Sequence, residues 1–67
     1  MTDGNKLTLE SVAAIVHNKR IALGMSQEAL ADAAGVSRKT ILRLEAGEST
    51  QLYNFLSVAN ALGLVIH

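Results

Sequence analysis

Glycines divide the chain into stretches that each have the length of a helix. They stand at positions 4, 24, 35, 47 and 63, and the chain contains no proline. Because glycine favours turns and helix ends, these positions predict where helices stop. Aromatic residues make up only 3% of the chain, and alanine and leucine supply most of the apolar share, which favours helices over a β-sandwich. The sequence therefore predicts an all-α fold of four helices.

Each of the first three predicted helices follows a hydroxyl residue that can cap its free amides. The expected helices are one from Thr8 to about Leu23, one over residues 27–34 capped by Ser26, one over residues 38–45 capped by Ser37, and one from residue 51 or 52 to 62 that ends at Gly63. The chain is interpreted as one domain over residues 1–67, with residues 1–6 as a flexible start and residues 64–67 as a C-terminal stub.

Apolar residues at helical spacing define the expected core. The residues expected to point inward are Leu9, Val12, Val16 and Leu23 with Ile15 on their flank, then Leu30, Ala31, Ala34, Ile41, Leu44, Leu52, Phe55, Leu56, Ala59 and Leu62. Arg20 falls at the edge of the first apolar stripe. An arginine in that place either reaches water or meets a buried carboxylate.

Several classes of function are disfavoured by what the chain lacks. Without cysteine there are no disulfides, thiolate metal ligands or thiol catalysis, and a reducing cytoplasm is the expected compartment. His17 and His67 are too far apart in sequence to pair as ligands, so neither a metal nor a cofactor is expected, and His17 is expected to be exposed and without a role. The serines have no partners at catalytic spacing, so we expect no enzyme. No apolar run is long enough to cross a membrane.

The charges balance in number but not in position. Six Lys and Arg residues offset six Asp and Glu residues, which alone would argue against a nucleic-acid partner. In the predicted third helix, however, Ile41 and Leu44 share one side while the opposite side carries Arg38, Lys39, Leu42 and Arg43. A solvated helix face is the ordinary explanation of such a cluster. A basic ridge for DNA is the alternative that the neighbouring residues favour.

Those neighbouring residues form a helix-turn-helix pattern over positions 27–45. Ala31 is small where two helices must approach closely, Gly35 suits a corner that needs a positive φ, and Ile41 can anchor the second helix to the core. The three features occur together in the register that the motif requires. We therefore expect double-stranded DNA to be the partner, read by the third helix.

At this level of detail the sequence resembles the XRE family of helix-turn-helix regulators, which includes the Cro and phage-repressor proteins. The resemblance covers residues 12–64 and rests on Lys19-Arg20, Leu23-Gly24-Met25-Ser26-Gln27, Leu30-Ala31, Gly35-Val36-Ser37, Ile41, Leu44-Glu45, Gly47 and Ala59-Asn60-Ala61-Leu62-Gly63. It implies a compact four-helix domain like that of the lambda repressor, with the third helix in the major groove.

The resemblance also implies roles for individual residues. Gln27 matches a glutamine that binds a phosphate and braces the first recognition residue, here Arg38. The positions that reach base edges or flanking phosphates are matched by Ser37, Arg38, Lys39 and Arg43, with Leu42 placed to touch a thymine methyl. Backbone contacts at helix starts are matched by Ser26, Ser49 and Thr50. Arg20 and Glu45 match a buried ion pair.

The end of the chain departs from the family pattern. Glu48 stands in a stretch where many relatives carry lysines or a proline, and Leu64-Val65-Ile66 replaces the usual fifth helix. This stub resembles the HipB antitoxin branch, in which a terminal strand pairs across a homodimer. The expected dimer interface comprises Val58, Ala61, Leu64, Val65 and Ile66. The alternative is a stub that folds back on its own core.

The sequence thus predicts a transcription regulator, a repressor that binds a palindromic operator as a homodimer. An antitoxin that binds a toxin protein and represses its own operon is the alternative. A purely structural helical bundle is the third possibility, but it would not explain why basic residues gather on one side of the predicted third helix.

Overall fold

The structure is a computed structural model that describes residues 7–64. It contains four helices, α1 (Leu9–Ala22), α2 (Gln27–Ala34), α3 (Arg38–Glu45) and α4 (Leu52–Ala61). Over the described residues there is no strand, and none of the helices there is long and apolar enough to cross a membrane. The all-α, four-helix prediction is confirmed.

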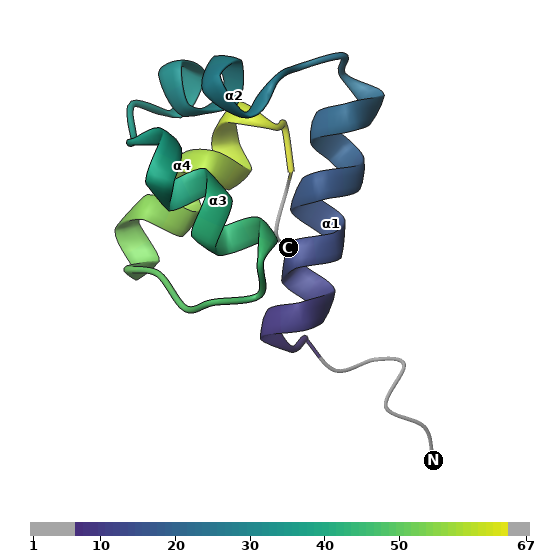
Figure 1. Ribbon diagram of the computed structural model, residues 1–67, viewed down its shortest axis with the longest axis vertical. Coiled ribbons are helices and arrows are strands. Elements are labelled where there is room, and N and C mark those ends of the chain that lie inside the picture. The colour runs from purple at the N-terminus through teal and green to yellow at the C-terminus, as the bar shows by residue number, and fades with distance from the viewer. Residues whose placement is uncertain (1–6, 65–67) are drawn as a thin grey trace.

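The helices form a small cluster in which α3 occupies a central position. Figure 1 shows α1 standing along one side of the molecule, α2 lying across one end, and α3 in front of α4. Residues of α3 contact both α1 and α2, and α2 also contacts α4. The third helix is therefore held from two sides.

The three hydroxyl caps are confirmed. The Oγ1 atom of Thr8 accepts a hydrogen bond from the amide of Ser11 at 3.0 Å. Ser26 caps α2 at 3.0 Å and Ser37 caps α3 at 3.2 Å in the same way. Helix α4 starts after Gln51, which makes no side-chain capping bond. These caps are interactions between near neighbours in sequence, and for that reason the pattern could predict them.

The core is made by all four helices. Its largest fully buried side chains are Val16, Leu30, Ile41, Val58 and Leu62. Four of these were expected from helical spacing. Val58 was expected at a dimer interface and not in the core, and that placement is wrong because its side chain is 0% exposed.

Four leucines predicted to face the core are instead exposed. Leu9 and Leu23 are 51% and 49% exposed, because they lie at the two ends of α1, where the neighbouring helices no longer cover it. Leu52 and Leu56 are 70% and 41% exposed. At about 100° per residue they lie about 120° and 160° from Val58, so a helix that buries Val58 turns them outward.

Candidate nucleic-acid interface

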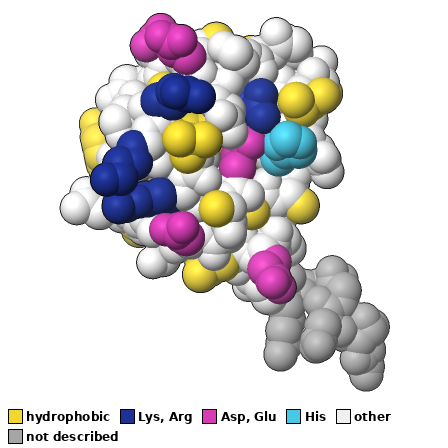
Figure 2. Space-filling model, in the orientation of Figure 1, with side chains coloured by type: hydrophobic (Ala, Val, Ile, Leu, Met, Phe, Trp, Pro, Cys, Tyr) yellow, Lys and Arg dark blue, Asp and Glu magenta, His cyan; other side chains and the backbone are white. Residues whose placement is uncertain are grey.

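The outward side of α3 carries the predicted basic ridge. Arg38, Lys39, Leu42 and Arg43 are all exposed, while Ile41 is 0% and Leu44 is 3% exposed on the opposite side. Figure 2 shows cationic side chains gathered on one side of the face on which α3 lies. The two buried residues fix the rotation of the helix about its axis, and this rotation keeps the basic side chains directed to solvent.

The corner between α2 and α3 is short. Gly35 ends α2 in the left-handed conformation with φ +71°, which favours glycine because a Cβ atom would be strained there. The amide of Val36 donates to the carbonyl of Ala31 at 3.0 Å, and Ala31 itself is buried. The corner therefore fixes the angle at which α3 leaves α2.

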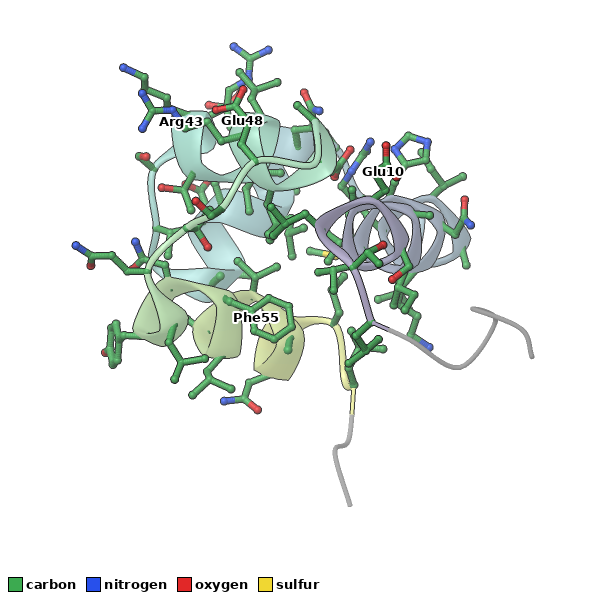
Figure 3. All side chains as sticks on the ribbon, turned by 90° about the horizontal axis from the view of Figure 1, so that it is seen from below. Glu10, Arg43, Glu48 and Phe55 are labelled. Carbon is green, nitrogen blue, oxygen red and sulfur yellow. The ribbon has the colours of Figure 1, made fainter. Side chains whose placement is uncertain are left out.

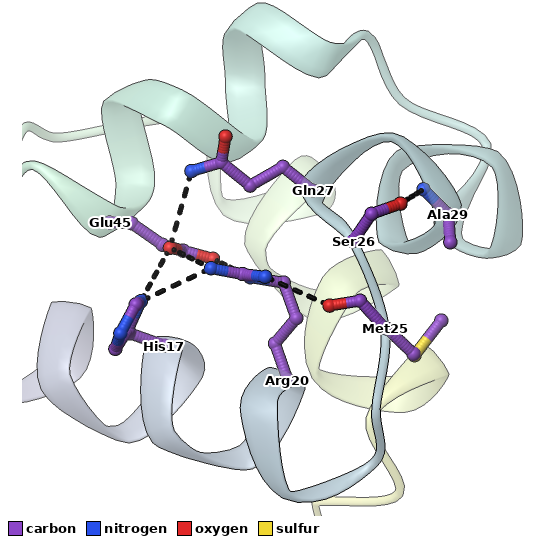
Figure 4. A network of polar contacts seen from close by, with 7 residues as sticks. All are labelled: His17, Arg20, Met25, Ser26, Gln27, Ala29 and Glu45. Atoms are coloured by element: carbon purple, nitrogen blue, oxygen red, sulfur yellow. Dashed lines mark hydrogen bonds and ion pairs between the residues drawn. The ribbon is translucent and has the colours of Figure 1, made fainter.

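An ion pair joins α1 to the last residue of α3. The Nε atom of Arg20 donates to Oε2 of Glu45 at 2.6 Å, and its Nη2 atom donates to Oε1 at 3.0 Å. Its Nη1 atom donates to the carbonyl oxygen of Met25 at 2.8 Å. Figure 4 shows the guanidinium between these acceptors. One arginine thus links α1, the loop before α2 and the end of the basic helix.

Burial and pairing act in opposite directions on these two groups. The side chains of Arg20 and Glu45 are only 8% and 7% exposed. Burial alone would raise the pKa of Glu45, but hydrogen bonds from Arg20, His17 and Gln27 and the charge of Arg20 outweigh it, so the pKa is lowered from its ordinary value. The hydrogen bond to Glu45 raises the pKa of Arg20 despite desolvation. Both groups are therefore charged at neutral pH.

His17 was predicted to have no role, but the structure gives it polar partners. Its side chain is 50% exposed, and its Nδ1 atom lies 2.9 Å from Oε1 of Glu45. The same Nδ1 atom lies 3.2 Å from Nη2 of Arg20. The prediction of exposure is confirmed, since half of the side chain is in solvent. Sequence spacing did not reveal these partners, because the fold brings Glu45 to His17 from 28 positions away.

Gln27 lies at the start of α2 and is half-buried. Its Nε2 atom donates to Oε1 of Glu45 at 3.4 Å, so the hydrogen bond that the structure gives this amide goes to Glu45 and not to Arg38. At 3.4 Å it is the longest hydrogen bond to that carboxylate, and it is correspondingly weak.

The loop before α4 lies beside Arg43. Ser49 and Thr50 line a polar hollow together with Arg43, Thr40, Gln51 and Asn54. Figure 3 shows Arg43 and Glu48 next to each other, with Nε of Arg43 4.0 Å from Oε1 of Glu48. Both side chains of this pair are more than half exposed, so it contributes little to stability. The hydroxyls of Ser49 and Thr50 thus lie next to the end of the basic ridge.

Of the residues predicted for a dimer interface, the structure describes Val58, Ala61 and Leu64. Val58 is buried within its own protomer, so it has no surface to offer a partner and does not belong to an interface. Ala61 and Leu64 are half-buried. Leu64 lines an apolar hollow with Leu7, Val12, Ile15, Val16, Phe55 and Ala59. Val65, Ile66 and His67 lie outside the described residues.

Residues 7–64 contain no group of three His, Cys, Asp or Glu side chains that could hold a metal ion. The exposed basic helix, with hydroxyl and amide groups at the starts of α2, α3 and α4, is the polar surface best suited to a ligand.

Comparison with known proteins finds one matching family. The family model described as "Helix-turn-helix" matches residues 16–65, which include α2, α3, α4 and the second half of α1. No curated protein matches the chain at a significant level.

Proposed function

Because the chain belongs to the XRE family of helix-turn-helix DNA-binding transcription regulators, we propose that it is a repressor that binds a palindromic operator as a homodimer. The observation that carries the proposal is the exposed basic side of α3, held by a buried anchor on its other side and by the ion pair at its end. A helix held in this way can enter the major groove at a defined angle.

Arg38, Lys39 and Arg43 supply the base and phosphate contacts in this proposal. Arginine presents two parallel N–H groups that match O6 and N7 of guanine, so we expect a guanine in each half-site. Leu42 lies between them and is 42% exposed, which leaves it free to contact a thymine methyl.

Phosphate contacts are assigned to residues at the starts of three helices. The set comprises Ser26, Gln27, Ser37, Ser49 and Thr50. Ser26 and Ser37 already accept amide hydrogen bonds within their own helices, so each hydroxyl contacts phosphate as a donor. The positive ends of the helix dipoles favour the same anion.

The homodimer is proposed from the apolar hollow beside Leu64. Leu7 and Ile15 on its rim are 77% and 43% exposed, an arrangement that favours a covering partner. A second copy, brought in through Leu64, Ala61 and the following Val65 and Ile66, would cover it. Two copies of α3 would then lie about 34 Å apart and read successive major grooves.

The test is operator binding by two matched variants. Sites selected from a random oligonucleotide pool provide the operator, and fluorescence anisotropy measures its affinity. We expect Arg43→Ala to weaken binding by about 1–3 kcal/mol without lowering the melting temperature. Lys19→Ala removes the same charge from α1 and serves as the control. Equal affinities for Arg43→Ala and Lys19→Ala would contradict the proposal.

An antitoxin is the second candidate function, and the exposed apolar residues of α4 favour it. Leu52 and Tyr53 are 70% and 77% exposed, and exposed apolar side chains at neighbouring positions can mark a protein partner. Purification of the untagged chain from its own cells tests the idea. A toxin that co-purifies at fixed stoichiometry supports it, whereas recovery of DNA alone would exclude it.

A further inference from the structure

An exposed carboxylate stands at the end of the basic ridge. Between positions 37 and 51 the chain contains two acidic residues, Glu45 and Glu48. Glu45 is buried in its ion pair with α1, whereas the side chain of Glu48 is 62% exposed. Figure 3 shows Glu48 beside Arg43. The carboxylate of Glu48 is therefore an exposed negative charge within the surface that we propose for DNA.

The backbone fixes the place of this carboxylate. The amide of Glu48 donates to the carbonyl oxygen of Arg43 at 3.0 Å, and the amide of Gly47 donates to the carbonyl oxygen of Leu44 at 3.2 Å. With a φ of +83° at Gly47, these two bonds form a Schellman motif, in which the chain turns back at the end of the helix. Glu48 is consequently held next to Arg43 by the main chain, whatever conformation the two side chains adopt.

The contact between the two side chains is electrostatic. Nε of Arg43 lies 4.0 Å from Oε1 of Glu48, which is too long for a hydrogen bond. Because both side chains are more than half exposed, the N–H groups of the guanidinium can still reach a ligand. Glu48 thus changes the charge that a ligand meets at Arg43 without occupying the donors of that arginine.

A phosphate and a base edge respond differently to this carboxylate. A phosphate bound by Arg43 carries a negative charge close to Glu48, and the two anions repel each other. O6 and N7 of guanine are neutral acceptors, so the carboxylate opposes their contact with Arg43 far less. The phosphate contacts proposed for Ser49 and Thr50 are the same in both cases. The difference between the two modes of binding therefore lies at Arg43.

We propose that Glu48 is a positioning residue of the DNA interface that sets specificity, because it disfavours a phosphate contact of Arg43 and leaves the contact with guanine. The inference rests on the proposed reading of bases by Arg43. Glu48 then lowers the affinity for non-operator DNA more than the affinity for the operator. The consequence is a larger specificity ratio, the quantity that matters when many non-specific sites compete with one operator.

The experiment compares wild type and Glu48→Gln in binding the selected operator and a duplex of equal length that lacks it. A carboxylate about 6 Å from a phosphate in water changes affinity by roughly threefold at low ionic strength. We therefore expect non-operator binding to tighten by roughly two- to fivefold in Glu48→Gln, and operator binding by less than about twofold. Asp32→Asn removes a charge of the same sign from an exposed position of α2 and should leave the ratio of the two affinities unchanged.

The salt dependence of binding provides a readout that a purely structural role of Glu48 would not move. If Arg43 neutralises one more phosphate in Glu48→Gln, the slope of log K against log salt concentration becomes steeper by about 0.9 for non-operator DNA. The slope for the operator should stay close to that of the wild type.

A double variant identifies the residue through which Glu48 acts. In an Arg43→Ala background, Glu48→Gln should no longer alter the ratio of operator to non-operator affinity. An unchanged ratio in the single variant Glu48→Gln would overturn the proposal, as would a ratio that changes equally in the absence of Arg43. Failure of the wild type to bind any selected operator would instead contradict the proposed function, which separates the two failures.

Discussion

Replacing Glu45 by glutamine leaves the guanidinium of Arg20 charged and buried without an opposite charge. The variant keeps the size of the side chain and one potential acceptor oxygen, but it removes the negative charge 2.6 Å from Nε of Arg20. Of the three hydrogen bonds that Arg20 donates to Glu45 and Met25, only the one to the carbonyl of Met25 is unaffected. With 8% of the Arg20 side chain exposed, water cannot fully replace the lost partner.

Breaking one partner of a buried pair costs about 3–5 kcal/mol. The surviving bond to Met25 and the amide oxygen of the new glutamine place our expectation near the lower end, about 3 kcal/mol. A single small domain of this size has a total stability of only about 3–5 kcal/mol. Glu45→Gln should therefore leave only about 0–2 kcal/mol of stability, so that between a few per cent and about half of the molecules are unfolded at 25 °C.

Urea denaturation followed by circular dichroism at 222 nm measures this loss. Glu48→Gln is the matched control, since it removes a carboxylate that is 62% exposed and should change the free energy of unfolding by no more than about 0.5 kcal/mol. The double variant Arg20→Met with Glu45→Leu should recover most of the stability, because apolar residues replace both charges. A loss below about 1 kcal/mol in Glu45→Gln would refute this account of the pair, as would a double variant as unstable as the single one.

Three other outcomes are expected. The folded-state pKa of Glu45 is lowered from 4.5. The stability that Glu45 contributes is therefore present above its unfolded-state pKa and is lost as the pH falls through its folded-state pKa. Urea denaturation at a series of acid pH values should show this loss in the wild type and a smaller loss in Glu45→Gln. Gly35→Ala should cost about 1–2 kcal/mol through its positive φ alone, since no atom lies within 4 Å of an added Cβ; unchanged melting would contradict this cause. Deletion of residues 64–67 should weaken dimers in sedimentation equilibrium while the helical circular dichroism signal is kept, and a shortened chain that dimerises as well as the parent would exclude the stub from the interface.

The fold could be predicted largely because its signals are local. Thr8, Ser26 and Ser37 each cap a helix that begins at the next residue. Gly35 marks a corner with the positive φ that its residue type favours. These features depend on residues a few positions apart, so the pattern of the chain carries them without knowledge of the tertiary structure.

The errors arose where burial depends on neighbours distant in sequence. Helix α4 carries apolar residues of its own on most of its sides. Spacing alone therefore could not show that Val58 points inward and that Leu52 and Leu56 point outward. For Leu9 and Leu23 the direction was correct, but the sequence does not show where the covering helices end. In α4 periodicity left several rotations of the helix open, and packing decided among them.

The site was predicted in outline but not in its connections. The basic residues of α3 were found from helical spacing. Spacing also placed Arg20 at the edge of an apolar stripe, where it either reaches water or meets a buried carboxylate, and the family resemblance supplied Glu45 as its partner. His17 and Gln27 reach Glu45 across 28 and 18 positions, and no local pattern reports such a contact. A histidine one turn before a buried arginine was the only available signal.

The most direct test of the central claim maps amide NMR signals while a duplex containing the selected operator is added to the protein at low ionic strength. We predict that the largest changes occur at Arg38, Lys39 and Arg43 and at the starts of α2 and α4, and that added salt weakens binding steeply as counterions are retained by DNA. Signals of α3 that stay in place while the duplex binds elsewhere, or fails to bind, would contradict the claim that this helix reads DNA.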